Sequence, residues 1–212
     1  LQQESADYNG DVEDLFQAEL YLISPITEAG RFLRKEYFLT SQQRDIERQI
    51  LKGIRQKHTG YYWFIGLPGT GKTLLLYDLA MKLSGRQKVC LIHCGRAGKE
   101  WRILHERLRR IDYLSDEQIH ENMDLSEYNG VLIDEAHLLS EENLQMILQA
   151  CGQQPVIFSS DCEDMISPEE LDQNTVKAMR HLPEMQTYHL TNRIRTNAEL
   201  SSFIQHMMHL PK

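Results

Sequence analysis

Apolar residues along this chain fall into short continuous runs separated by longer segments in which they recur every three or four positions. Short continuous runs are typical of buried strands, and the longer spacing is typical of helices. The predicted strands are Tyr61–Ile65, Val89–His93, Val131–Ile133, Val156–Phe158 and Thr187–Leu190. Strands that alternate with helices predict an α/β fold, with a parallel five-stranded sheet and helices on both of its faces.

Two further helices are predicted before the first strand. One spans Val12–Ile23 and stops before Pro25, because proline disfavours a helical conformation at the preceding residue. The other spans Thr40–Lys57 and carries apolar residues on one face: Ile46, Ile50, Leu51 and Ile54. We therefore expect residues 1–38 to form an N-terminal extension, partly mobile and with one helix, and residues 39–212 to form one domain.

A glycine-rich segment follows the first predicted strand and matches the pattern G-x-x-x-x-G-K-[ST]. Glycines permit positive φ angles and let backbone N–H groups approach an anion, and the next helix adds N–H donors at its N-terminus. Lys72 would reach the β- and γ-phosphates, and Thr73 would ligate Mg²⁺. The segment predicts a P-loop that binds ATP and Mg²⁺ through Gly66, Leu67, Pro68, Gly69, Thr70, Gly71, Lys72 and Thr73.

Adjacent carboxylates follow the third predicted strand, at Asp134 and Glu135. Beside a P-loop, Asp134 would hold Mg²⁺ and Glu135 would polarise the attacking water. A solvated turn or a helix cap is the alternative, and the P-loop upstream favours the catalytic interpretation.

The ends of the last two predicted strands carry further candidates. Asp161 follows the fourth strand, at the sheet edge where ligands bind in open α/β folds, and is a candidate sensor of the γ-phosphate or its water. A loop leading into a helix is the alternative. Arg193 and Arg195 follow the fifth strand and are either neutralisers of phosphoryl charge or ordinary surface arginines.

Basic residues concentrate between Arg96 and Arg110, in a chain with a net charge of -8. One interpretation is a surface for single-stranded DNA or RNA, on which Trp101 stacks against a base. The other is an amphipathic helix in which Arg102, Glu106 and Arg110 pair at i,i+4 while Trp101, Leu104 and Leu108 pack on the core. Charge-striped helices are common, which favours the second interpretation.

Composition narrows the location of the protein. No apolar run approaches the ~20 residues that a membrane span needs, and the N-terminus lacks the features of a signal peptide. The four cysteines include no C-x-x-C pair, which predicts reduced thiols rather than a metal site. We expect a cytoplasmic protein with no membrane partner.

The motifs, taken in order, resemble the first motor domain of superfamily 1 helicases, a RecA-like P-loop NTPase. The closest resemblance is to the Schlafen group-3-type helicase domain. It covers about Thr40 to Leu210 and is carried by Leu39–Gln43, Gly66–Ala80, Val131–His137, Ser160-Asp161 and Leu190–Asn197.

The resemblance implies roles for three residues. Gln43 matches an adenine-reading glutamine, although it also completes a capping box begun by Thr40. Arg195 matches an arginine that contacts the γ-phosphate, and Asp161 matches the aspartate of the third helicase motif. The glutamine that usually follows three residues later is here Asp164, which puts the coupling of phosphate sensing to DNA in doubt.

Length separates the chain from a complete motor of this kind. From Arg195 to Lys212 only 17 residues remain, too few for the second RecA-like domain of the resembling helicases. We therefore weigh two functions. The first is an ATPase domain with Glu135, Lys72 and Arg195 as its catalytic residues, and the second is a nucleotide-dependent switch that hydrolyses little ATP and binds a protein partner. A small-molecule kinase is a third alternative, and it lacks a recognisable arginine-rich lid.

Overall fold

The computed structural model describes residues 23–95, 101–161 and 175–191, with the side chains of Trp101 and Arg102 excepted. Its centre is a parallel sheet with the strand order β3-β2-β4-β5-β1-β6. The strands are β1 Tyr61–Gly66, β2 Val89–His93, β3 Ile111–Ser115, β4 Val131–Asp134, β5 Val156–Asp161 and β6 Gln186–Leu190. The predicted α/β fold is confirmed, with six strands in place of the expected five.

The missed strand is β3, at one edge of the sheet. The prediction extended a helix to Arg110 instead, but α5 (Trp101–Arg107) ends earlier and Arg110 lies beyond it. Ile111 and Tyr113 are buried while Asp112 and Leu114 are partly exposed, which is the alternation of a strand with one covered face. The strand was missed because it offers only three apolar residues, Ile111, Tyr113 and Leu114, and Asp112 interrupts them.

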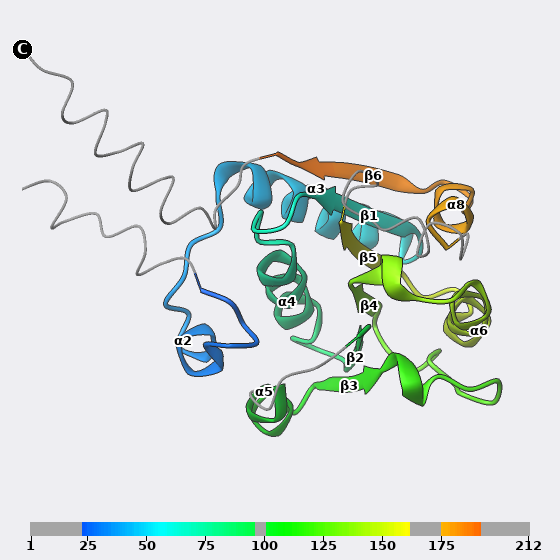
Figure 1. Ribbon diagram of the computed structural model, residues 1–212, viewed down its shortest axis with the longest axis horizontal. Helices are drawn as coiled ribbons and strands as arrows, with labels where there is room; N and C mark the ends of the chain where they lie inside the picture. The colour runs from blue at the N-terminus through cyan, green and yellow to red at the C-terminus, as the bar shows by residue number, and fades with distance from the viewer. Residues whose placement is uncertain (1–22, 96–100, 162–174, 192–212) are drawn as a thin grey trace, which may run out of the picture.

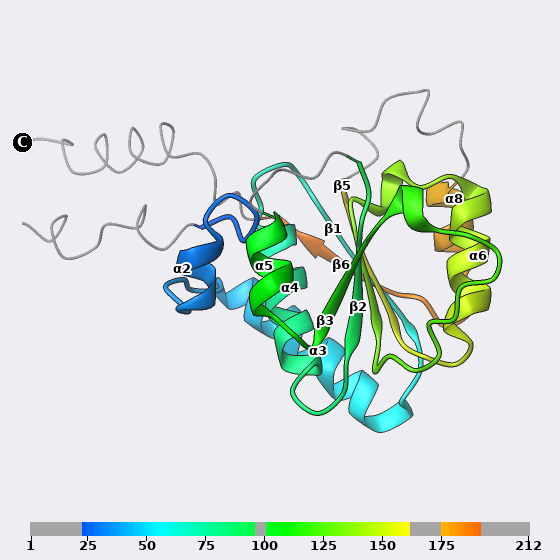
Figure 2. The same cartoon turned by 90° about the horizontal axis from the view of Figure 1, so that it is seen from below.

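Helices cover both faces of the sheet, as the sequence predicts. α3, α4 and α5 lie on one face and α6 and α8 on the other, as the two perpendicular views show (Figures 1 and 2). The helices whose bounds have not yet been given are α2 Ala29–Leu33, α3 Ser41–Lys57, α4 Lys72–Leu83, α6 Glu141–Cys151 and α8 Thr175–Arg180. The 3-10 turns are η2 Asp116–Gln118 and η3 Ala136–Leu138.

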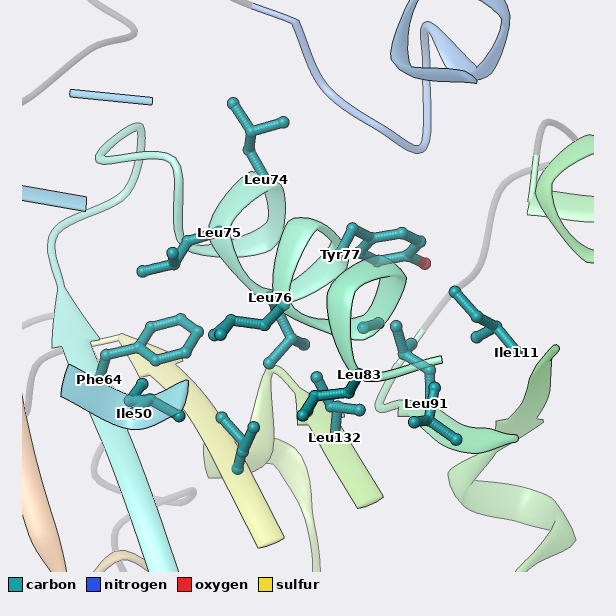
Figure 3. Packing of buried hydrophobic residues seen from close by; sticks show 14 of the residues in the cluster. Ile50, Phe64, Leu74, Leu75, Leu76, Tyr77, Leu83, Leu91, Ile111 and Leu132 are labelled. Atoms are coloured by element: carbon teal, nitrogen blue, oxygen red, sulfur yellow. The ribbon is translucent and has the colours of Figure 1, made fainter. Parts of the chain in front are cut away.

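Alternate residues of the central strands fill two separate cores. Tyr62 and Phe64 of β1 point into the core beneath α3 and α4, whereas Trp63 and Ile65 point into the core beneath α6 and α8. Leu75 and Leu76 of α4 are fully buried in the first core (Figure 3), and so is Leu79. Burial on all sides explains why the sequence of α4 is almost continuously apolar over its first turns.

The N-terminal extension contributes to this first core. Phe32 of α2 is fully buried, stacks on Tyr37 at 5.1 Å and meets Tyr77 edge-on at 6.0 Å. The predicted helix at Val12–Ile23 lies outside the described residues apart from Ile23, and α2 was not predicted. Side chains of the extension thus contribute to the core of the domain, and the boundary at residue 38 stays a prediction.

The structure bears on two predictions made from composition, which concern membrane spans and cysteines. Among the described residues no helix combines the length and the apolar character required to cross a bilayer. The three described cysteines, Cys90, Cys94 and Cys151, are buried free thiols. Burial raises the pKa of each, so these thiols are poor metal ligands and poor nucleophiles.

Candidate functional site

The P-loop joins β1 to α4 at the carboxyl edge of the sheet. Gly69 and Gly71 have φ angles of 82° and 78°, in the left-handed region that favours glycine. A Cβ at Gly66 would lie 2.6 Å from Thr70 Oγ1 and 2.9 Å from the Leu190 carbonyl oxygen, so only glycine fits there. The glycines of the pattern are therefore required by the loop's own geometry.

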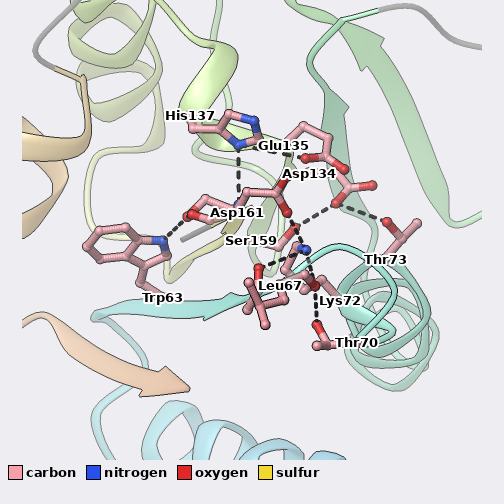
Figure 4. Close-up of polar contacts among 12 residues, drawn as sticks. Trp63, Leu67, Thr70, Lys72, Thr73, Asp134, Glu135, His137, Ser159 and Asp161 are labelled. Carbon is pink, nitrogen blue, oxygen red and sulfur yellow. Dashed lines mark hydrogen bonds and ion pairs between the residues drawn. The ribbon is translucent and has the colours of Figure 1, made fainter. Parts of the chain in front are cut away.

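Lys72 is the first residue of α4, and its ammonium group is turned back into the loop. Nζ donates to the carbonyl oxygens of Gly66 at 3.1 Å and Leu67 at 3.2 Å, and to Asp161 Oδ1 at 2.6 Å (Figure 4). The lysine side chain is 6% exposed and that of Asp161 is 20% exposed. Such a pair is stable only while both partners remain, because either charge alone would be buried without compensation.

Asp134 ends β4 and is completely buried. Its Oδ1 accepts hydrogen bonds from Ser159 Oγ at 2.6 Å and from Thr73 Oγ1 at 3.4 Å, and its Oδ2 lies 3.5 Å from His93 Nδ1. The structure therefore brings together Thr73 and Asp134, the two residues predicted to hold a metal. Both offer oxygen, the ligand type that Mg²⁺ prefers, so they fit this ion.

Ser159 and His93 were missed as partners of Asp134. They belong to β5 and β2, the two strands that flank β4 in the sheet. The order of strands is not encoded in any local pattern, so nothing in the sequence identified them.

Glu135 follows Asp134 with a φ of 53°, a left-handed conformation that few non-glycine residues adopt. Burial raises the pKa of Glu135 to about 7, and the nearby charges of Asp134 and Asp161 add to that shift, while Lys72 and His93 oppose it. Backbone strain of this kind costs about 1–3 kcal/mol and is concentrated at functional sites. The strained backbone and the raised pKa both mark Glu135 as a candidate functional residue.

His137 lies between Glu135 and Asp161. Its Nδ1 accepts a hydrogen bond from the backbone N–H of Asp161 at 3.4 Å and lies 3.7 Å from Glu135 Oε2. One acceptor atom each from Glu135, His137 and Asp161 falls within 4.8 Å of the others. The ends of β4 and β5 are therefore joined by polar contacts at the site.

Gln43 connects α3 to the P-loop. Gln43 Oε1 accepts a hydrogen bond from the Thr40 N–H at 2.8 Å, and the Gln43 N–H donates to Thr40 Oγ1 at 3.1 Å. These two bonds confirm the capping box. Gln43 Nε2 donates to the carbonyl oxygens of Thr70 at 3.1 Å and Gly71 at 3.2 Å. The buried side chain thus supports the loop, and its reading of adenine stays a prediction.

A cavity of about 180 Å³ lies beside the P-loop. Its wall contains P-loop residues, Glu135 and Asp161, together with three residues of the N-terminal extension that the sequence did not indicate: Ile23, Ser24 and Pro25. The cavity therefore has the two catalytic-type groups, Lys72 and Glu135, on its surface.

Several predicted residues fall outside the described part of the chain: Arg96, Lys99, Asp164, Arg193 and Arg195. In the basic segment, Leu104 is buried and Leu108 packs against the core, as the helical interpretation expects. The expected pairing of Arg110 within the helix is wrong, because Arg110 lies beyond α5 and donates to the Gly85 carbonyl oxygen.

The fold is similar to that of a solved structure. The Pif1 helicase from Candida albicans superposes with a TM-score of 0.50 and 17% identity, over 82% of this chain and 44% of that one. The large terminase of a thermophilic bacteriophage has a TM-score of 0.47 and 12% identity, and the match covers 80% of this chain and 50% of that one. Unliganded Pif1 from Bacteroides sp has a TM-score of 0.41 and 15% identity, and the match covers 80% of this chain and 45% of that one. The chain thus spans half or less of each of these proteins.

Sequence comparison is more specific. No curated protein matches the chain. The family model for the Schlafen group 3, DNA/RNA helicase domain matches residues 62–211. This match takes in β1, the P-loop, the carboxylates after β4 and Asp161, and it covers well over half of the chain. The protein therefore belongs to the Schlafen group 3 DNA/RNA helicase domain family.

Proposed function

We propose that this helicase-like domain binds ATP with Mg²⁺ and hydrolyses the γ-phosphate, as the ATPase part of a protein that acts on DNA or RNA. One observation carries the proposal: Lys72, Thr73, Glu135 and Asp161 border a single cavity, with Asp134 hydrogen-bonded to Thr73. A cation, a hydroxyl, a candidate base and a metal-binding carboxylate are the groups that phosphoryl transfer needs.

Binding would begin with an exchange of partners at Lys72. The lysine now donates to Asp161 and to two loop carbonyls. The phosphates of ATP would replace Asp161 as the acceptor, with backbone N–H groups of the P-loop and of the start of α4 as further donors. Asp161 would then accept a hydrogen bond from the attacking water.

Hydrolysis would follow by in-line attack. The water oxygen forms a bond to the γ-phosphorus while the bond from that phosphorus to the β–γ bridging oxygen breaks, and Glu135 takes the proton of the water. A pKa of about 7 suits Glu135 for this role, because a general base works best near the ambient pH. Bound Mg²⁺, held by Thr73 and Asp134, would neutralise charge on the phosphate oxygens. Arg195 would complete the γ-phosphate site.

A nucleotide-dependent switch with little hydrolysis is the second candidate. The contact of Lys72 with Asp161 at 2.6 Å favours it, because the ion pair competes with phosphate and gives the site two alternative arrangements. In that case the exchange of partners would alter the surface offered to a protein partner or to a second motor domain. A cytoplasmic location stays a prediction under either function.

A steady-state assay of phosphate release, with and without single-stranded DNA or RNA, separates the two functions. The ATPase proposal predicts Mg²⁺-dependent release that nucleic acid stimulates. Tight ATP binding with no release under any of these conditions would favour the switch.

A further inference from the structure

Helix α3 carries an unusual charge for this protein. It contains five basic residues and two acidic ones, in a chain whose net charge is -8. Four of the basic residues recur at helical spacing on one face and are exposed to solvent: Arg44, Arg48, Lys52 and Arg55. We call these four side chains the α3 basic face.

Acidic neighbours neutralise this face only weakly. Arg48 lies 3.0 Å from Asp45, but both side chains are largely exposed, at 75% and 60%, where ion pairs contribute little. The carboxylate of Glu47 is bonded to Lys82 of α4. Lys52 and Arg55 form no ion pair within the described part of the chain. The positive potential of the face therefore persists.

A groove of about 470 Å³ follows the same face. Within the described residues its wall consists of the α3 basic face together with Glu47, Leu51 and Gln56. We propose that this groove binds the phosphate backbone of single-stranded nucleic acid, as a contact surface separate from the ATP site.

Three features favour a nucleic-acid backbone over an acidic protein. Three of the four cations are arginines, whose planar guanidinium matches a phosphate with paired hydrogen bonds, and a step of four residues along a helix advances about 6 Å, which lets successive side chains reach successive phosphates. Protein interfaces instead rely on buried aromatic and apolar anchors. The exposed large apolar residues of the described chain are Phe38 and Ile103, and neither lies on α3.

The same helix is bonded to the nucleotide site. Gln43, next to Arg44, donates to the P-loop carbonyls of Thr70 and Gly71. Gln42 donates to the His189 carbonyl oxygen at 2.9 Å and accepts from the Thr191 N–H at 3.1 Å. A strand held on α3 would therefore restrain the helix that supports the P-loop. This coupling rests on the proposed ATPase function, whereas binding of the strand does not.

The test is binding of a fluorescent oligothymidylate to the whole chain without ATP, followed by anisotropy over a range of salt concentrations. The variant is Arg48→Ala/Arg55→Ala. Its matched control is Arg86→Ala/Lys177→Ala, which removes the same charge from exposed positions outside α3. We expect the first pair to weaken binding about tenfold or more and to lower the slope of log K against log salt by about 1.4, because each phosphate contact on a single strand contributes about 0.7. The control should change little.

Three results would overturn the proposal. The first is equal loss in both double variants, which would indicate only the effect of net charge. The second is loss confined to a further variant, Arg107→Ala/Arg109→Ala, which would place the strand beside α5. The third is competition by polyglutamate as strong as that by unlabelled oligothymidylate, which would indicate an acidic protein partner. Thermal melting of each variant checks that it folds.

Discussion

Two glutamates of this domain, Glu135 and Glu47, share a pKa of about 7 but differ in their place in the fold. Burial is the largest cause of the raised pKa at both Glu135 and Glu47. Glu135 borders the cavity at the carboxyl edge of the sheet, in a strained backbone conformation. Glu47 belongs to α3, is 7% exposed, and its carboxylate forms an ion pair with Lys82 of α4. A perturbed pKa alone therefore does not identify a catalytic residue.

The groups around each glutamate extend the comparison. At the cavity, Lys72 pairs with Asp161 and a hydroxyl, that of Ser159, donates to Asp134. Around Glu47, Lys82 pairs with Asp78 at 3.0 Å, and the Tyr37 hydroxyl also donates to Asp78. Both clusters combine a lysine, acidic side chains and a hydroxyl, but the cluster around Glu47 joins the N-terminal extension to α3 and α4. Equivalent substitutions should therefore affect ligand binding at the cavity and stability in the cluster around Glu47.

The lysines give the largest contrast. Lys72→Ala should weaken ATP binding by about 10- to 150-fold, because charge-assisted hydrogen bonds contribute about 1.5–3 kcal/mol. Lys82→Ala should leave ATP binding unchanged and lower the melting temperature, because Glu47 and Asp78 lose their shared cation. Titration with a fluorescent ATP analogue and thermal melting measure the two effects. Equal losses of ATP binding in both variants would remove the distinction between the clusters.

The hydroxyls test the same contrast at smaller magnitude. Ser159→Ala should lower the affinity for Mg²⁺ in the presence of ATP by about 10- to 100-fold, because Ser159 orients the carboxylate of Asp134. Tyr37→Phe should cost about 1 kcal/mol of unfolding free energy and leave the Mg²⁺ affinity unchanged. Magnesium dependence of ATP binding and urea denaturation are the measurements. A weaker Mg²⁺ affinity in the Tyr37 variant would contradict the separation.

Glu47 predicts a modest pH dependence of stability. Its pKa in the folded protein, about 7, lies above its ordinary value of 4.5, so the folded state favours the protonated form. The resulting stabilisation is fully present below about pH 4.5 and is lost as the pH rises through about 7. Glu47→Gln cannot titrate, so the melting temperature of the wild type should fall relative to this variant between pH 5 and pH 7.5. Parallel melting curves across that range would show that Lys82 keeps Glu47 ionised.

Sequence patterns predicted the features of this fold that depend only on residues close together in the chain. The P-loop follows from glycines, a lysine and a hydroxyl at fixed spacing, and five strands follow from apolar runs. β3 escaped because it lies at a sheet edge, where only Ile111 and Tyr113 face the core. The partners of Asp134 escaped because they depend on β4 lying between β2 and β5, an order that only the folded sheet defines.

The central claim is that Glu135 acts as the base in ATP hydrolysis, and Glu135→Gln tests it most directly. The amide keeps the size of the side chain and removes its ability to accept the proton of the water. Phosphate release should fall by about 10²- to 10⁴-fold, the usual contribution of a general base, while ATP binding with Mg²⁺ stays within about twofold of the wild type. Release at the wild-type rate with intact binding would contradict the account.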